Sequence, residues 1–297
     1  MTGPILVTGA DGFVGPYLLA ELGGEGIPVE ADVTDAKALA GEFGAGSPRA
    51  VVHLAGHSSV ADSWQVGSEV WRVNVVGTAC VLDAVRVTAP QARLLAVSTG
   101  EVYGQAEEIP TTEEARIAPI SPYAASKAAA ELACGQAQRD GVDVVVARAF
   151  QHEGPGRDER FAIGSWTRQI ARLEEQGGGT LFVGDLSVRR DITDVRDVCR
   201  AYRLLLDPEV PAGTYNVASG QAVSLQDVLD RLIGMARCPI TVEADPGRSR
   251  PTDLTVICGD ASKLAAATGW APTIPLDQTL TDALEAARAA ATEKVEA

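Results

Sequence analysis

Several features are scarce in this chain of 297 residues, and each scarcity excludes a class of protein. The five cysteines are scattered and odd in number, and none forms a CxxC pair, which argues against a disulfide framework or a zinc site. We therefore predict reduced thiols and no bound metal. No basic segment precedes the first apolar run, and no apolar run approaches the roughly 18 residues of a membrane span. These absences predict a soluble, cytoplasmic protein with no membrane partner.

Positive charge is also in short supply. Lysine and arginine number 25 against 40 aspartates and glutamates, so the formal net charge is −15. Nucleic acids are polyanions that attract basic surfaces, and this balance therefore excludes nucleic acid as the main partner. It is still compatible with an anionic small substrate, provided that a few arginines converge at one place.

Strand-like apolar runs and helix-like amphipathic stretches alternate through the first half of the chain. In order, these segments are 4–8, 13–22, 27–31, 35–43, 50–54, 66–87, 93–98, 121–139 and 143–148. Such alternation predicts an α/β fold, a Rossmann-type doubly wound parallel sheet with right-handed crossovers. After Arg148 the elements become shorter and less regular, which predicts a smaller C-terminal α/β cap.

This pattern suggests a division into two domains. We expect residues 1–150 to form a dinucleotide-binding domain, with 190–209 returning to it. Residues 151–189 and 210–297 are then expected to form a cap that binds the substrate.

A glycine-rich turn, TGADGFVG at residues 8–15, directly follows the first apolar run. Glycines in a strand-to-helix turn let the backbone approach a pyrophosphate and direct helix N–H groups at it. The predicted cofactor contacts in this turn are Gly9, Gly12, Phe13, Val14 and Gly15. The second strand-like run is too short to choose between Glu30 and Asp32 as the residue that binds the adenosine ribose. The preference between NAD and NADP therefore stays open.

Tyr123 and Lys127 lie four residues apart in a helix-like stretch, which places them on one helix face. Small neighbours allow a ligand to approach, and Thr99 ends a preceding strand-like run. A nearby ammonium stabilises a phenolate, so we expect Lys127 to lower the pKa of Tyr123 toward neutral pH. The pair predicts acid–base chemistry beside the dinucleotide.

These motifs together resemble the extended short-chain dehydrogenase/reductase family. The matching stretches are TGADGFVG at 8–15, HLAG at 53–56, STGEVYG at 98–104 and SPYAASK at 121–127. The resemblance implies NAD(P)(H) as cofactor and a homodimer formed through the helices near 66–87 and 121–139. It also implies a catalytic tetrad and further cofactor contacts. The tetrad is Thr99, Tyr123, Lys127 and Asn74, and the contacts are Asp32, Val33, Leu54, Ala55 and Gly56.

The second half of the chain resembles a narrower branch, that of GDP-mannose 4,6-dehydratases and GDP-6-deoxy-4-keto-mannose reductases. The stretches are HSSVADSW at 57–64, FQHEGPGR at 150–157, VGDLSVRRDITDVRD at 183–197 and RPTDLTVICGDASKLAAATGWAP at 250–272. The reductases are the closer match. The resemblance implies NAD(P)H-dependent reduction of a GDP-4-keto-6-deoxyhexose to GDP-rhamnose. The implied substrate contacts are His57, Ser58, Ser59, Gln151, His152, Arg190 and Arg250.

Two positions keep other readings open. Glu101 has the spacing from Thr99 of the base that eliminates water in 4,6-dehydratases, but Gly100 offers no general acid. Gln151 stands where the family usually has asparagine, which leaves the pose of the sugar open. The alternatives are a nucleotide-sugar 4,6-dehydratase, an epimerase, or a non-catalytic dinucleotide-binding regulator. The presence of Thr99, Tyr123 and Lys127 argues against the regulator.

Overall fold

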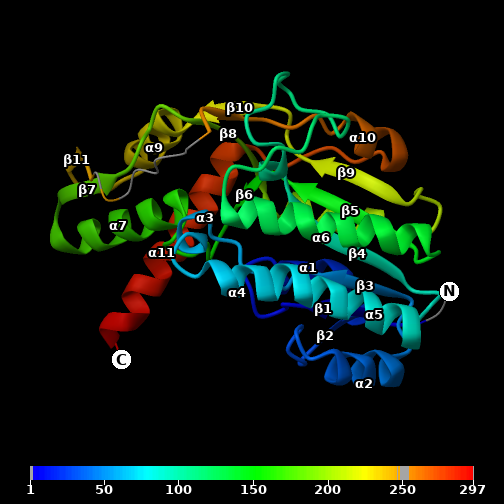
Figure 1. Cartoon of the computed structure of the whole chain (residues 1–297). Coiled ribbons are helices and arrows are strands. Elements are labelled where there is room, and N and C mark those ends of the chain that lie inside the picture. The colour runs from blue at the N-terminus through cyan, green and yellow to red at the C-terminus, as the bar shows by residue number, and fades with distance from the viewer. Residues whose placement is uncertain (1–2, 246, 248–253, 297) are drawn as a thin grey trace.

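The structure is a computed structural model that describes residues 3–245, 247 and 254–296. Its centre is a six-stranded sheet in the order β2-β1-β3-β4-β5-β9, with every neighbouring pair parallel (Figure 1). The strands are short and rich in valine and leucine, as expected for strands that are buried on both faces. They are β1 (Ile5–Thr8), β2 (Gly26–Pro28), β3 (Ala50–His53), β4 (Arg93–Thr99), β5 (Val144–Ala149) and β9 (Gly213–Val217).

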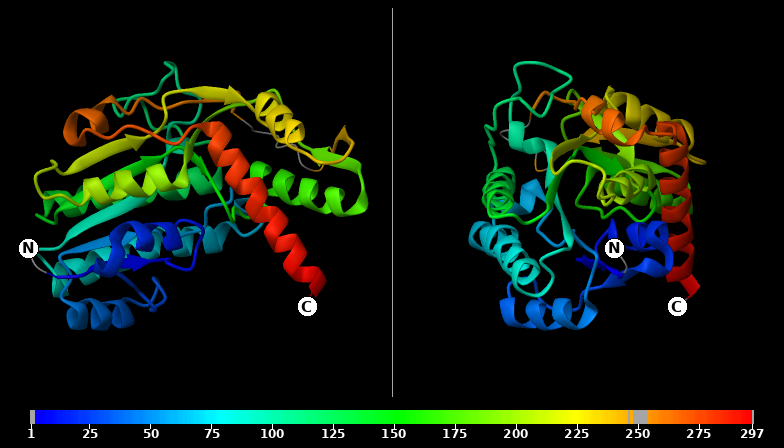
Figure 2. Two further views of the ribbon diagram at one scale, coloured as in Figure 1. Left: turned by 180° about the vertical axis from the view of Figure 1, so that it is seen from behind. Right: turned by 90° about the vertical axis from the view of Figure 1, so that its right-hand side faces the viewer.

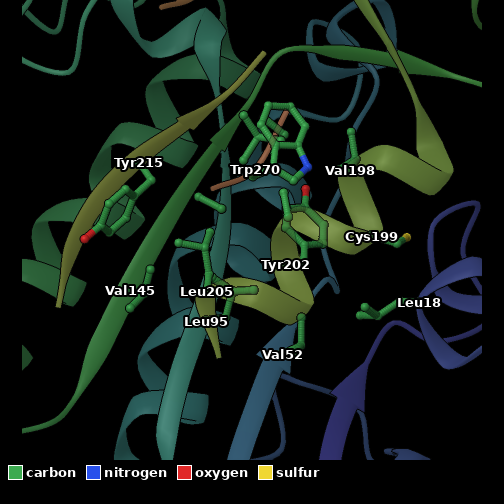
Figure 3. Packing of buried hydrophobic residues seen from close by; sticks show 14 of the residues in the cluster. Leu18, Val52, Leu95, Val145, Val198, Cys199, Tyr202, Leu205, Tyr215 and Trp270 are labelled. Carbon is green, nitrogen blue, oxygen red and sulfur yellow. The ribbon is translucent and has the colours of Figure 1, made fainter. Parts of the chain in front are cut away.

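Helices cover both faces of this sheet. One face carries α1 (Gly15–Leu22), α8 (Val195–Leu205) and α10 (Ser262–Thr268). Figure 3 shows this layer, in which α8 places Val198, Cys199, Tyr202 and Leu205 against side chains of the strands. The other face carries α2 (Ala36–Gly46), α5 (Thr78–Thr88) and α6 (Pro122–Arg139). Successive strand residues point to opposite faces, so Ile5 and Val7 join the first core and Leu6 joins the second.

The expected helix at 66–87 is interrupted. The segment consists of α4 (Gly67–Trp71), a π-helical stretch η2 (Arg72–Gly77) and α5, and the short α3 (Val60–Ser63) precedes it. Two 3₁₀ turns, η1 (Gly23–Glu25) and η3 (Gly100–Tyr103), follow α1 and β4. A π-helical stretch changes which side chains face a neighbouring element, and such stretches are frequent at functional sites. The one in this chain contains Asn74.

The cap has its own small sheets and core. Strand β8 (Arg189–Asp194) lies between β10 and β12 and also pairs with β6, and β7 pairs with β11. The helices of the cap bury a separate apolar cluster beside these strands. Figure 2 shows the long α11 crossing the back of the molecule, with its C-terminal end projecting from it. The remaining bounds are β6 (Gln151–Glu153), β7 (Gly179–Val183), β10 (Ala222–Ser224), β11 (Ile240–Ala244), β12 (Val256–Ile257), α7 (Ala162–Gln176), α9 (Leu225–Gly234) and α11 (Leu276–Glu296).

The expected division of the chain is wrong at two places. Strand β9 falls within 210–297, which was assigned to the cap, but it is the sixth strand of the central sheet and pairs with β5. Strand β8 falls largely within 190–209, which was expected to return to the first domain, but it is the centre of a cap sheet. Both strands are short and carry polar residues, and their sequence pattern does not reveal which sheet a strand joins.

Within the described ranges, no helix is long and apolar enough to cross a membrane.

Candidate active site

A cavity of about 1490 Å³ opens at the carboxyl edge of the central sheet, between that sheet and the cap. Its walls come from the loops after β1, β3, β4 and β5, from α6 and from the cap. Parallel α/β sheets bind ligands at this edge. A drug-sized ligand needs roughly 300–1,000 Å³, so this cavity has room for two ligands side by side.

The glycine-rich turn forms one wall. Gly9 has φ +66°, and a Cβ on it would lie 2.7 Å from the Cα of Ala55, so the turn packs directly on the loop after β3. At Gly15 a Cβ would lie 2.0 Å from the Ala10 carbonyl oxygen, so the start of α1 is equally close to the turn. Of the five predicted turn contacts, four line the cavity: Gly9, Gly12, Phe13 and Val14. Gly15 does not, and its role is to allow the close packing behind them.

The loop after β3 forms the next wall. Leu54, Ala55, Gly56, His57 and Ser58, which are predicted to contact the cofactor or the substrate, all line the cavity.

Asn74 holds this loop from behind and does not line the cavity. Its Oδ1 accepts a hydrogen bond from the backbone N–H of His57 at 2.8 Å, and its Nδ2 donates to the Oγ of Ser126 at 2.9 Å. A Cβ on Gly56 would lie 2.8 Å from the same Oδ1. Asn74 therefore joins the loop to helix α6.

Helix α6 carries the predicted acid–base pair. It begins with Pro122, and the Oγ of Ser121 accepts a hydrogen bond from the N–H of Ala124 at 3.1 Å, which fixes the first turn. Tyr123 and Lys127 are both buried and both line the cavity, together with Thr99 and Glu101 from the end of β4. The structure thus brings these four predicted residues together.

The electrostatics of the pair differ from the expectation. Burial raises the pKa of Tyr123 well above its usual value, and the Glu101 charge raises it further, whereas a Thr99 hydrogen bond and the Arg157 charge lower it. The prediction that Lys127 lowers the pKa of Tyr123 toward neutral pH is therefore wrong for the protein without a bound ligand. The ammonium of Lys127 donates to the Val97 carbonyl oxygen at 2.9 Å, and burial lowers the pKa of Lys127 to about 8.

A buried ion pair supports α6 one turn beyond Lys127. Arg148 on β5 contacts the carboxylate of Glu131 at 2.6 Å, and both side chains are less than a tenth exposed. The same carboxylate accepts a hydrogen bond from Ser98 Oγ, and Arg148 also donates to the Tyr103 hydroxyl at 2.9 Å. These contacts tie α6 to β4 and β5. Sequence reasoning missed them, because they join residues on four different elements.

The cap contributes the facing wall, which includes the predicted residues Gln151, His152 and Arg190. The ring of His152 stacks on that of Phe13, with centroids 6.2 Å apart, and burial lowers the pKa of His152 to about 4, so this ring is neutral. The guanidinium of Arg190 donates to the Leu254 carbonyl oxygen at 2.8 Å. Arg250, the other predicted arginine, lies outside the described residues.

Besides Gly15 and Asn74, three further predicted residues do not line the cavity. The Oδ1 of Asp32 accepts hydrogen bonds from the backbone N–H and the hydroxyl of Thr34, both at 2.8 Å, so it closes a turn. Val33 is buried against Gly77. Ser59 is buried, and its Oγ accepts a hydrogen bond from the N–H of Asp62 at 3.2 Å, so it caps α3.

The structure adds lining residues that sequence reasoning did not single out, among them Arg157, Phe161 and Tyr202. Tyr202 is fully buried, and its hydroxyl has no hydrogen-bond partner among the residues that the structure describes. In Figure 3 this hydroxyl points toward the ends of the strands that carry the arrowheads, which is the edge where the cavity opens. Buried hydroxyls normally have a partner, so an unpaired one in a cavity wall fits a bound polar ligand. Only Arg157 had a sequence signal, because it ends the stretch at 150–157.

A dinucleotide fits the walls of this cavity, which offer a glycine-rich turn at the start of a helix, a buried hydroxyl and a lysine beside a tyrosine.

The described residues offer no comparable site for a metal ion. No group of three or more His, Cys, Asp or Glu side chains is placed to hold a metal ion in the part of the chain that the structure describes.

Comparisons with known proteins agree with this geometry. The family model of GDP-mannose 4,6 dehydratases matches residues 27–283. The GDP-6-deoxy-D-mannose reductase of Pseudomonas aeruginosa is 37% identical over 292 residues, which span 94% of this chain and 95% of that protein. The GDP-mannose 4,6-dehydratase of Sinorhizobium fredii is 28% identical over 261 residues, spanning 80% of this chain and 74% of that protein. The structure of RMD from P. aeruginosa complexed with NADPH superimposes with a TM-score of 0.90 at 35% identity, covering 97% of this chain and 100% of that one.

Proposed function

We propose a function from the premise that this chain belongs to the GDP-mannose 4,6-dehydratase family of extended short-chain dehydrogenases/reductases. In this proposal the protein is an NAD(P)H-dependent reductase of a GDP-4-keto-6-deoxyhexose. The product would be GDP-rhamnose. The observation that carries the proposal is the convergence of Thr99, Tyr123 and Lys127 with the glycine-rich turn on one cavity large enough for cofactor and substrate.

The residues of the cavity have separate tasks in this reaction. When bound, a reduced nicotinamide supplies the hydride for C4 of the sugar. Tyr123 gives its phenolic proton to the C4 oxygen, and Thr99, which lines the same cavity at the end of β4, orients the phenol. Lys127, held by the Val97 carbonyl oxygen, would bind the nicotinamide ribose. The high pKa of Tyr123 suits this direction, because the phenol stays protonated at neutral pH and is ready to act as an acid.

The packing around Gly100 favours a reductase over a dehydratase. Elimination of water needs a general acid beside the Glu101 base, and residue 100 lies between Thr99 and Glu101 at the end of β4. A Cβ on Gly100 would lie 2.7 Å from the ring of Phe150. No side chain fits there unless that buried ring moves, so this position carries no acid. We assign Glu101 a hydrogen bond to the sugar instead.

The cap residues are proposed to hold the nucleotide sugar. Guanidinium groups match phosphate oxygens in shape and charge, and Arg190 brings one to the cavity of a protein with net charge −15. Gln151 and the neutral His152 face the same space and offer uncharged polar groups to the sugar. Arg250 belongs to the same proposal on the strength of its sequence context alone.

The direct test is nicotinamide absorbance during incubation with GDP-4-keto-6-deoxymannose and NADH or NADPH in turn. We expect stoichiometric loss of the reduced cofactor and a product two hydrogen atoms heavier, and the faster cofactor gives the preference. Tyr123→Phe is the matched control and should consume no cofactor. Absence of consumption by the wild-type protein would refute the reductase. Turnover of GDP-mannose without net cofactor consumption would then identify the dehydratase.

We also infer a homodimer in the cytoplasm. Helices α4, α5 and α6 lie side by side on one face of the sheet (Figure 1) and expose large apolar side chains. Leu132 is 72% exposed and Trp71 is 43% exposed. Light scattering should report twice the chain mass, and Leu132→Glu should halve it, whereas Val242→Glu, on the exposed cap strand β11, should not. A monomeric wild-type protein would refute the dimer.

The five cysteines are all unpaired thiols, as suits a reducing compartment.

A further inference from the structure

The hydroxyl of Tyr202, on helix α8, is buried without a partner. The side chain is 0% exposed, and its oxygen meets no hydrogen-bond partner in the part of the chain that the structure describes. Other buried tyrosines of this protein bond internally. The Tyr103 hydroxyl donates to the side chain of Asn216 at 2.7 Å, and the Tyr215 hydroxyl donates to a backbone carbonyl oxygen at 2.8 Å. A buried hydroxyl that lacks such a bond is costly, so Tyr202 calls for a partner that the chain does not supply.

The ring of Tyr202 packs beneath the floor of the cavity. It belongs to the apolar cluster on the α8 face of the central sheet, and it lines the cavity itself. The same cluster includes cavity-lining side chains from the carboxyl edge of the sheet, namely Phe13, Val14, Leu54, Val97 and Ala149. Figure 3 shows the Tyr202 hydroxyl directed toward that edge. The hydroxyl is therefore aimed from below at the occupant of the cavity.

Two features of the site identify the part of the cofactor above this floor. Phe13 and Val14 belong to the glycine-rich turn, where the N–H groups at the start of α1 suit the pyrophosphate. Val97 lies on the other side, and its carbonyl oxygen accepts from the ammonium of Lys127 at 2.9 Å. Lys127 is the residue proposed above to bind the nicotinamide ribose. The phosphate and ribose of the nicotinamide half join these two positions, and both carry oxygens that accept hydrogen bonds.

A phenol is suited to such a contact. Burial raises the pKa of Tyr202 well above its usual value, so the hydroxyl stays protonated and neutral. It can then donate a hydrogen bond without placing a second negative charge beside a phosphate. Hydrogen bonds to charged oxygens are stronger than those between neutral groups.

We propose, resting on the reductase function above, that Tyr202 is a cofactor-binding residue whose hydroxyl donates a hydrogen bond to the phosphate–ribose unit in the nicotinamide half of the dinucleotide. Helix α8 thereby takes part in the site from the face of the sheet opposite to α6. The bond exists only in the complex. The hydroxyl therefore lowers the stability of the free protein and raises the affinity for the cofactor, and these two effects can be measured separately.

The test uses Tyr202→Phe, which removes the hydroxyl and keeps the packing of the ring. Binding of NADH and NADPH is followed by the fluorescence of the reduced nicotinamide, with no substrate present. We expect the dissociation constant of the preferred cofactor to rise about fivefold or more, because one hydrogen bond is lost. The unfolding temperature of the cofactor-free variant should be at least that of the wild type, because the free protein loses no bond.

Tyr215→Phe is the matched control. Tyr215 is a buried tyrosine of the same apolar cluster, but its hydroxyl is paired and it does not line the cavity. This variant should lower the unfolding temperature and leave the dissociation constant unchanged, which is the reverse of the result expected for Tyr202→Phe. A second control is 5′-AMP, which contains only the adenosine half of the cofactor. Its affinity, measured by displacement of the reduced cofactor, should be equal in Tyr202→Phe and wild type.

Three results would overturn the proposal. The first is an unchanged dissociation constant in Tyr202→Phe. The second is an equal loss of affinity for 5′-AMP, which would place the bond in the adenosine half. The third is a lower unfolding temperature of cofactor-free Tyr202→Phe, which would show that the hydroxyl is already paired in the free protein. A wild-type protein that binds NAD(P)H but does not consume it with the GDP-sugar would refute the reductase and leave this bond intact, so the two proposals fail separately.

Discussion

The pH dependence of activity provides a quantitative test of how Lys127 is held. Burial lowers its pKa to about 8, from an ordinary value of 10.5. The ammonium form is the one that would bind the cofactor ribose, so kcat/KM should fall as the pH rises through 8. At pH 9 the protonated fraction, and hence kcat/KM, should be about a tenth of its plateau value. Tyr123 does not produce this fall, because its pKa is raised.

The same pKa predicts the opposite trend for stability. A lysine whose pKa is lower in the folded state binds its proton more weakly there, so folding is penalised most at pH values below about 8. The penalty disappears as the pH rises toward the unfolded-state value, and its size is on the order of 3 kcal/mol. The unfolding free energies of wild type and Lys127→Met can be measured in urea at several pH values. As the pH rises, the wild-type protein should gain stability relative to the variant.

The assay is NAD(P)H consumption across pH 6–10 with the substrate of the proposed reaction. Lys127→Arg keeps a positive charge at every pH in this range, so its lower activity should lack the fall near pH 8. The matched control is Lys263→Arg, at an exposed position on α10, which should retain the wild-type profile. A wild-type profile that stays level to pH 9.5, or an identical fall in Lys127→Arg, would refute the assignment.

Three further outcomes follow from the site. Tyr123→Phe should lower kcat by at least about 100-fold while NAD(P)H binding, followed by fluorescence, changes less than about twofold; retained turnover would contradict the role of the phenol. Glu131→Gln should cost about 3–5 kcal/mol of unfolding free energy in urea, because it leaves Arg148 buried without its partner; a loss below 1 kcal/mol would show that the pair is not stabilising. Gly9→Ala places a Cβ 2.7 Å from Ala55 and strains a positive φ, so cofactor affinity should fall at least about tenfold in a fluorescence titration; unchanged affinity would remove the turn from the site.

The central sheet and the placement of Tyr123 beside Lys127 were predictable because they depend on local signals. Strand-like runs alternating with amphipathic stretches gave the Rossmann-type order, and spacing placed Tyr123 and Lys127 on one helix face. The break of the helix at η2 was not predictable in this way. Whether a stretch such as Arg72–Gly77 is α- or π-helical depends on what its side chains contact, here Asn74 with the loop at His57.

The charge environment of the site depended on contacts distant in sequence. Lys127 was expected to act on Tyr123 because the two are four residues apart. Its ammonium instead donates to the backbone oxygen of Val97 on β4, whereas burial and the Glu101 charge raise the pKa of Tyr123. The pKa of a buried group depends on burial and on every nearby charge, and both are properties of the assembled protein.

The sequence by itself determined the fold class and the places of the glycine-rich turn and of the Tyr123–Lys127 pair, since each depends on residues that are close together along the chain. Only the tertiary structure decided that β9 completes the central sheet, that Phe150 leaves no space for a side chain at residue 100, and that Arg157 lies between Phe13 and Phe161. Those three features join segments tens of residues apart, and packing between them, rather than local preference, fixes their geometry.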